Sequence, residues 1–162
     1  MELKRRKFER RTLSNIELMS AEADKGGVNM NNISKEQKLE LMDSFGKIVI
    51  EDVRDRALRI SMDIVKYKTV NPIKLKEYSV LASLSAEQQE AICNLLSETI
   101  TDTIYRFLEI FEENEDDMKI IIKKDEQEYN MVEISEKMGS EIACYEDNGW
   151  IQRFSNIGRF VL

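Results

Sequence analysis

The stretch that decides the fold is residues 34–67, SKEQKLELMDSFGKIVIEDVRDRALRISMDIVKY. It opens with Ser34-Lys35-Glu36-Gln37, a capping box in which the Ser and Gln side chains bind free backbone N–H groups at a helix start. Apolar residues then recur every three or four positions, which predicts one face of a long α-helix. That stripe comprises Leu41, Phe45, Ile48, Val49, Val53, Ala57, Ile60, Ile64 and Tyr67. Asn71-Pro72 is expected to end the helix, because the residue before a proline is pushed out of the α region.

The opposite face of this helix is expected to carry charged side chains. They are Lys47, Glu51, Asp55, Arg59, Asp63 and Lys66. Asp55 precedes Arg59 by four residues, an order of charges that supports a helix. Gly46 is interpreted as the position of a bend.

A second long helix follows a connector over residues 73–84. It opens with a second capping box, Ser85-Ala86-Glu87-Gln88. Its predicted apolar face comprises Ala91, Ile92, Leu95, Leu96, Thr99, Ile100, Ile104, Phe107, Leu108 and Phe111. Two long helices joined by a moderate connector are expected to lie antiparallel and to bury these stripes against each other.

The hydrophobic period then changes from helical to alternating. Residues 118–124 read as a β-branched strand, 125–128 as a turn and 129–134 as the returning strand of a hairpin. In the tail, Asn148-Gly149 predicts a turn. Trp150 is expected to cap the core between the hairpin and the helices, with an interface anchor as the alternative role.

Together these patterns predict an α+β fold that is mostly α. It contains two long antiparallel helices, a small β-hairpin and a short C-terminal segment, in a single domain over residues 30–162.

Residues 1–29 are expected to be a disordered or non-native extension. Lys25-Gly26-Gly27 can be encoded as AAA-GGA-GGN, which is a bacterial ribosome-binding sequence, and Met30 follows at a suitable spacing for a start codon.

Composition excludes several chemistries. The 162 residues include no histidine, which removes His-based catalysis and His-ligated metal sites. Cys93 and Cys144 are far apart and form no CxxC spacing, so a reducing cytoplasm is the predicted compartment. No apolar run is long enough for a membrane span.

Residues 125–136 have EF-hand spacing, but Asn130 replaces the turn glycine and Tyr129 takes a ligand position. No cofactor or metal site is predicted.

Charge is unevenly distributed along the chain. Residues 1–29 hold seven basic and five acidic residues, a net charge of +2, and the remainder holds 17 basic and 26 acidic residues, a net of −9. An acidic body disfavours nucleic acid and anionic lipid, and suits a basic protein partner. The predicted partner-binding residues are Glu112, Glu113, Glu115, Asp116, Asp117 and Arg153. A solvated loop without a ligand is the alternative interpretation of the acidic run.

Part of the chain resembles a family of small uncharacterised bacterial proteins. The similarity runs from Leu84-Ser85-Ala86-Glu87 through Phe107-Leu108-Glu109 and continues with Val132–Ser135 and Asn148–Ser155, NGWIQRFS. The family pattern combines a long helix, a short hairpin, an "ISDGL-GEL" segment and a "DGWI-RFS" ending. Glu136-Lys137-Met138 stands where the pattern has Asp-Gly-Leu, and Asn148 replaces its Asp. The resemblance implies a fold, and these departures disfavour catalytic carboxylates at the two positions.

The predicted function is non-catalytic protein–protein interaction in the bacterial cytoplasm, of the kind performed by immunity proteins or antitoxins. One alternative is a metal-dependent enzyme that uses the carboxylates of the tail. These are Glu133, Glu136, Glu141, Glu146 and Asp147. Another is nucleic-acid or membrane binding through the basic cluster within residues 4–11. Self-association through leftover helix faces stays open, although no heptad series specifies a coiled coil.

Overall fold

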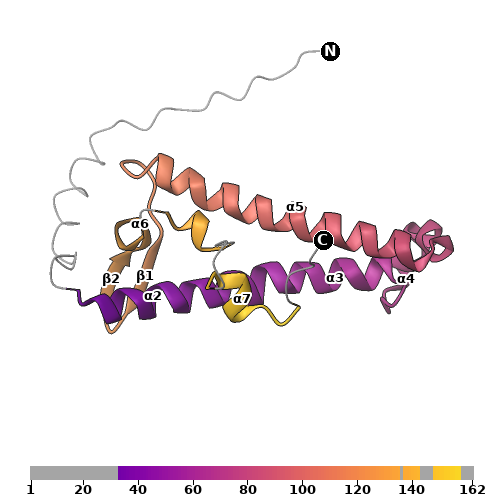
Figure 1. Ribbon diagram of the computed structural model, residues 1–162, viewed down its shortest axis with the longest axis horizontal. Helices are drawn as coiled ribbons and strands as arrows, with labels where there is room; N and C mark the ends of the chain where they lie inside the picture. Colours follow the sequence, from indigo (N-terminus) through magenta and orange to yellow (C-terminus); the bar gives the residue numbers. More distant parts are fainter. Residues whose placement is uncertain (1–32, 136, 143–147, 158–162) are drawn as a thin grey trace, which may run out of the picture.

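The computed structural model describes residues 33–135, 137–142 and 148–157. Two antiparallel helical arms form the body of the protein (Figure 1). The first arm is a continuous run of α2 (Lys35–Ile48), the π-helix η4 (Val49–Asp55) and α3 (Arg56–Val65). The second arm is α5 (Ala86–Glu113). The connector holds α4 (Pro72–Glu77) and the 3-10 helix η5 (Ser79–Ser83). After α5 come β1 (Ile121–Lys124), β2 (Gln127–Asn130), α6 (Met131–Ile134), the 3-10 helix η6 (Gly139–Glu141) and α7 (Trp150–Phe154). The predicted fold class, mostly α with a small hairpin, is confirmed.

Both predicted capping boxes are present and define where the arms begin. The Gln37 backbone N–H donates to Ser34 Oγ at 3.1 Å, and the Ser34 N–H donates to Gln37 Oε1 at 3.0 Å. Ser85 and Gln88 repeat this exchange at 3.2 and 2.9 Å. Each box satisfies two N–H groups that a helix start would otherwise leave unbonded.

The π-helix changes which residues of the first arm face inward. Its i→i+5 bonds make a wider turn than an α-helix, so the residues that follow it are rotated relative to a regular 3.6-residue pattern. Ile48, Val53 and Ile60, which the regular pattern places in the apolar stripe, are more than half exposed. Asp55, which the pattern places in solvent beside Arg59, is fully buried. The predictions for Val53, Asp55 and Ile60 are wrong because they assume one unbroken α-helix. Ile48 lies before the π-helix, in α2, where Leu41, Met42 and Gly46 are the buried residues instead.

The hairpin is shorter than predicted. β1 and β2 pair antiparallel, with Lys124 opposite Gln127, so the turn contains only Asp125 and Glu126. Both turn residues have positive φ, 51° and 63°, as tight two-residue hairpin turns require. The expected return strand over 129–134 is wrong beyond residue 130. The Asn130 side chain accepts a bond from the Val132 N–H and so starts α6 instead.

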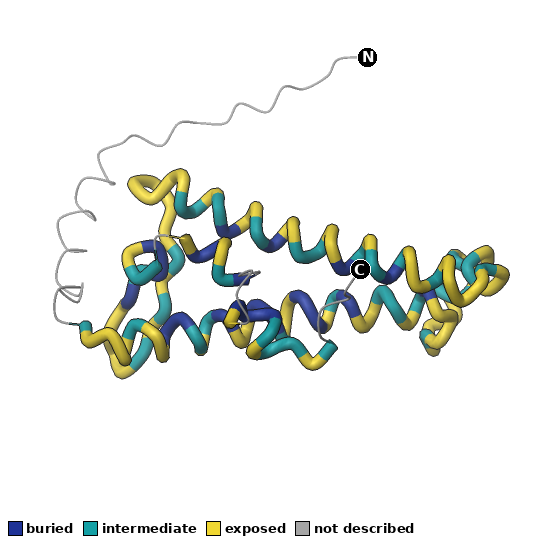
Figure 2. Tube along the Cα trace, in the orientation of Figure 1, coloured by how far each residue is buried: buried dark blue, intermediate teal, exposed yellow. Residues whose placement is uncertain are grey.

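The main hydrophobic core lies at the end of the molecule where the two arms spread apart. Here, next to the hairpin, η6 packs on α5, α6 packs on α2, and α7 packs on α2 and η4 (Figures 1 and 2). The buried cluster comprises Met42, Val49, Ile50, Ile104, Leu108, Met131, Val132, Met138, Ile142, Trp150 and Ile151. Beyond it, α3 packs directly along α5. None of the helices in the described part of the chain is long and apolar enough to cross a membrane.

Trp150 belongs to this core and is fully buried, which agrees with the core role predicted for it over that of an interface anchor. Its ring lies on the backbone of Gly46, where an added Cβ would come within 2.5 Å of the indole. Phe45 meets it edge-on, with 5.8 Å between ring centroids. Gly46 therefore makes room for the indole, and α2 continues through it as a helix to Ile48.

Candidate functional site

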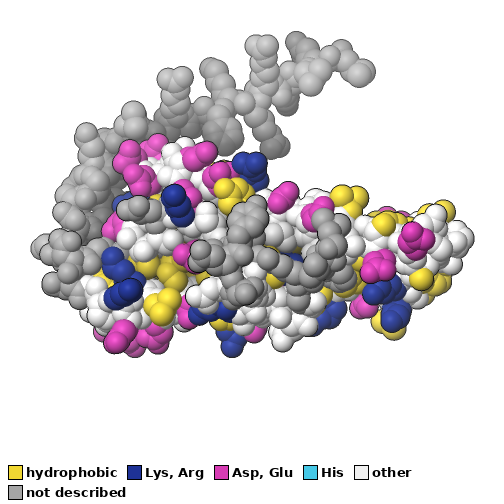
Figure 3. Space-filling view, viewed as in Figure 1, with side chains coloured by type: hydrophobic (Ala, Val, Ile, Leu, Met, Phe, Trp, Pro, Cys, Tyr) yellow, Lys and Arg dark blue, Asp and Glu magenta, His cyan; other side chains and the backbone are white. Residues whose placement is uncertain are grey.

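The predicted acidic run is located at the C-terminal end of α5 and in the turn that follows it. We call Glu112, Glu113, Glu115, Asp116 and Asp117 the acidic end. Figure 3 shows acidic side chains gathered over this part of the surface. Four of the five residues are exposed, and none of those four has an ion pair or side-chain hydrogen bond within the described residues. Glu112 differs, because its Oε1 accepts a bond from the Gly139 N–H at 2.7 Å and so attaches η6 to α5.

A polar pocket adjoins the acidic end. It is lined by Glu115, Asp116, Lys119, Asn130, Val132 and Glu133. Asn130 Nδ2 donates to Glu133 Oε1 at 2.8 Å, which orients that carboxylate at the start of α6. The structure thus brings Glu115 and Asp116 together with Glu133, which lies on α6, beyond both strands of the hairpin. Lys119 is the single cationic side chain among the lining residues that the structure describes.

Arg153, the remaining predicted binding residue, lies on α7, far along the chain from the acidic run. Its guanidinium forms an ion pair with Asp43 of α2 and lies 4.7 Å from the centroid of the Phe154 ring. The Arg153 side chain retains 27% exposure. These contacts join α7 to α2, and a role for Arg153 in partner binding stays a prediction.

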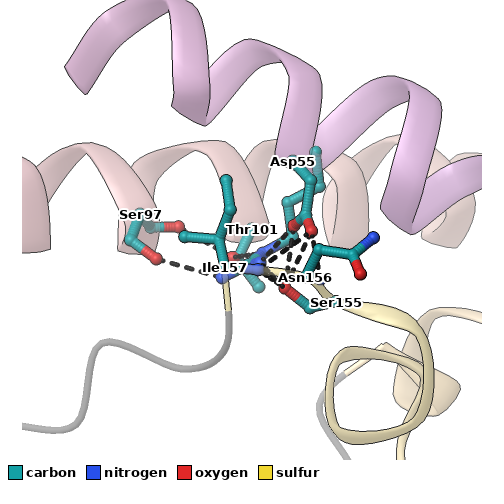
Figure 4. A network of polar contacts seen from close by, with 7 residues as sticks. Asp55, Ser97, Thr101, Ser155, Asn156 and Ile157 are labelled. Atoms are coloured by element: carbon teal, nitrogen blue, oxygen red, sulfur yellow. Dashed lines mark hydrogen bonds and ion pairs between the residues drawn. The ribbon is translucent and has the colours of Figure 1, made fainter. Parts of the chain in front are cut away.

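A buried polar network lies between the two arms and was not predicted from the sequence. Arg54 and Asp55 are adjacent in η4, are 1% and 0% exposed, and form an ion pair at 3.0 Å. Arg54 Nε donates to Thr101 Oγ1 at 3.0 Å and Nη2 donates to Ser97 Oγ at 3.1 Å (Figure 4). Both hydroxyl groups belong to α5. The guanidinium therefore joins the first arm to the second through hydrogen bonds.

Asp55 attaches the C-terminal segment to the same network. Ser155 Oγ donates to Asp55 at 2.9 Å to Oδ1 and 3.0 Å to Oδ2. The Asn156 N–H donates to Oδ2 at 2.7 Å, and the Ile157 N–H donates to it at 3.3 Å (Figure 4). A buried carboxylate is stable only when it is paired and hydrogen-bonded, and these contacts meet that need. The network consequently fixes the chain that follows α7 against both arms.

Chemically, this network is built to hold structure. Among the described residues Ser155 is the one hydroxyl in contact with Asp55, and nucleophilic catalysis by a serine requires an adjacent base that is free to accept its proton. The carboxylate oxygens of Asp55 are already used by backbone and hydroxyl donors and by Arg54. Two sequence features together could have indicated the network. One is the Arg54-Asp55 pair next to the predicted apolar stripe of the first helix, and the other is Ser97 and Thr101, one turn apart on the second helix.

The other chemically active groups are dispersed. Glu133 and Glu141 belong to different elements, α6 and η6, while Glu136, Glu146 and Asp147 lie outside the described residues. Within the described ranges no group of three or more His, Cys, Asp or Glu side chains could hold a metal ion. Cys93 is buried on the inner side of α5, and burial raises the pKa of its thiol. A thiol with a raised pKa is less reactive, since the thiolate is the nucleophile.

Accessibility separates the two charged regions. The network is closed to a partner by the C-terminal segment, whereas the acidic end presents four of its five carboxylates to solvent. Comparison of the whole chain with protein-family models, with curated proteins and with solved structures finds no match. The acidic end is therefore the candidate functional site on the basis of its own charge and exposure.

Proposed function

We propose that the protein is a non-catalytic interaction protein whose acidic end binds a basic protein partner. The observation that carries this proposal is the exposure of Glu113, Glu115, Asp116 and Asp117 at one end of the molecule, without internal ion pairs among the described residues. Such a surface attracts a cationic partner by its summed potential and raises the rate of association. An immunity protein or an antitoxin, which neutralises a partner by binding it, is the functional class that this describes.

The position of the acidic residues supports a role other than folding. Carboxylates at the C-terminal end of a helix face the negative end of the helix dipole, which is unfavourable. The polar pocket beside them adds Asn130 and Glu133 as hydrogen-bonding groups for a cationic side chain. Arginine is a suitable ligand there, because its guanidinium donates several hydrogen bonds in a fixed plane.

The test compares the full chain with a variant whose acidic end is neutralised. The variant carries Glu113→Gln, Glu115→Gln, Asp116→Asn and Asp117→Asn. Each protein is used to capture partners from an extract of the organism that encodes the chain. A captured protein is then purified, and its Kd for each variant is measured by calorimetry at low and high salt. We expect a basic protein that binds the natural chain and loses affinity on neutralisation or with added salt.

A matched control removes the same number of charges at positions away from the acidic end. It carries Asp52→Asn, Asp63→Asn, Glu87→Gln and Glu90→Gln, all at exposed positions. The control should keep the affinity of the natural chain. Equal binding by all three proteins, or capture of no stoichiometric partner, would show that the acidic end is only a solvated surface.

A further inference from the structure

A shallow groove runs along the outward face of α5, on the side away from the first arm. Its lining residues are Thr99, Asp102, Thr103, Arg106, Phe107 and Ile110. The lining is mostly apolar because Phe107 is 56% exposed and Ile110 is 45% exposed. Exposed aromatic side chains of this size are common as anchors at the centre of interfaces. The regular helix of α5 keeps these residues on one face, since they recur at three- and four-residue steps.

The charges within the groove have opposite signs and lie one helical turn apart. Asp102 precedes Arg106 by four residues on the same face. Arg106 Nη1 is held by Glu109 Oε2 at 2.8 Å, yet its side chain is 73% exposed. Consider a second copy related by a two-fold axis that is perpendicular to α5 and lies midway between positions 102 and 106. This axis places position 102 of each copy opposite position 106 of the other. Under that axis the Asp102 carboxylate of each copy faces the Arg106 guanidinium of the other.

From this arrangement we propose that the groove is an isologous interface between two copies of the chain, paired through antiparallel α5 helices. A two-fold interface requires a self-complementary surface, and a groove with one charge of each sign meets that requirement. In the same alignment Ile110 of one copy lies opposite position 98 of the other, one residue from Thr99, so its apolar side chain comes near the threonine methyl group. The small threonines also allow the helices to approach at the usual interaxial distance of about 8–10 Å.

The antiparallel direction also suits the charge of the whole molecule. A parallel pair would place two acidic ends side by side and add their repulsion. The antiparallel pair separates the two acidic ends and turns each one toward the half of the second copy that carries the connector. Residues 66–84 of that connector hold four lysines and one glutamate, although Glu87 and Glu90 follow at the start of α5. The inference does not depend on the function proposed for the acidic end.

The test uses reversal of the two groove charges. Asp102→Arg gives a chain with two facing cations, and Arg106→Asp gives a chain with two facing anions. Sedimentation equilibrium of the full chain should show a concentration-dependent dimer whose Kd rises at least about tenfold in either single variant. The double variant, Asp102→Arg with Arg106→Asp, restores opposite charges and should recover the dimer. An equimolar mixture of the two single variants should form a heterodimer, because their charges are complementary.

Apolar and folding controls accompany the charge reversals. Phe107→Ser should weaken the dimer, whereas Ile60→Ser, at a position on α3 with 57% exposure, should leave its Kd unchanged. Far-UV circular dichroism and thermal unfolding check that each variant keeps its helices. A natural chain that is monomeric at every concentration would overturn the proposal. A dimer that both single variants retain, or that neither the double variant nor the mixture restores, would overturn it as well.

Discussion

The protein has two concentrations of charge that behave in opposite ways, the buried network of Arg54 and Asp55 and the exposed acidic end. In the network Arg54 and Asp55 are paired with each other and hydrogen-bonded, Arg54 to the second arm and Asp55 to the C-terminal segment. At the acidic end, like charges adjoin one another next to a helix terminus that they disfavour. The buried network contributes to folding, and the exposed acidic end is consistent with the proposed role in binding. The network and the acidic end should therefore respond to mutation with opposite signs.

The largest effect is expected from breaking the buried ion pair. Asp55→Ala leaves the Arg54 guanidinium buried without its carboxylate and removes the acceptor for Asn156 and Ile157. Removing one partner of a buried pair typically costs about 3–5 kcal/mol. The free energy of unfolding, measured by urea denaturation, should fall by that amount.

A double variant distinguishes a buried charge from a lost contact. Arg54→Met combined with Asp55→Leu removes both charges and keeps similar side-chain volume. It should lose less stability than Asp55→Ala, because no unpaired charge remains in the interior. A double variant that is as unstable as the single variant would mean that the hydrogen bonds to residues 156 and 157 are the main contribution.

The next effect is expected at the apolar anchor of the same C-terminal segment. Trp150→Ala should destabilise the protein by roughly 3 kcal/mol or more, because a large buried aromatic side chain is removed. The indole is fully buried on Gly46, so neighbouring side chains cannot easily fill the space. Thermal and urea unfolding measure the loss. Gly46→Ala is a complementary test from the opposite side, since its Cβ would overlap the indole.

How far the sequence predicts this structure depends on whether each pattern is local. The capping boxes were found correctly because their partners lie three residues apart, and Trp150 was placed in the core by its size. The network could not be predicted, because it joins η4, α5 and the C-terminal segment, about a hundred residues apart. A π-helix has no sequence pattern comparable to a capping box, so the rotation that buries Asp55 was also missed. At the acidic end, composition identified the residues, but only the structure shows that Glu112 is bonded to Gly139.

Two threonines on α5 allow a smaller test of how much the hydrogen bond from Arg54 contributes to the free energy of unfolding. Thr101 and Thr103 each donate to the carbonyl four residues earlier, at 2.7 Å in both cases. Only Thr101 also accepts a bond from Arg54 Nε. Thr101→Val should cost about 1–3 kcal/mol, because it leaves a buried donor without its acceptor. Thr103→Val lies on the outward face and should change stability by less than about 0.5 kcal/mol. Equal losses in urea unfolding would contradict the role given to Arg54.

The smallest effect, and the one with the opposite sign, is expected at the acidic end. Glu113→Gln removes a negative charge from the last turn of α5, where the helix dipole disfavours it. This substitution should raise the free energy of unfolding by about 0.3–1 kcal/mol at low salt. Glu87→Gln is the matched control, because it makes the same change in the first turn of the same helix, where the dipole favours a carboxylate. It should lower stability by a similar amount.

Opposite signs at Glu113 and Glu87, both decreasing with added salt, would show that the acidic end costs stability in the free protein. Residues that reduce stability are often kept for function, because binding sites are seldom optimised for folding. A loss of stability in Glu113→Gln would instead mean that this carboxylate has a structural partner. The acidic end would then resemble the buried network, and the contrast between the two charged regions would no longer support a binding role.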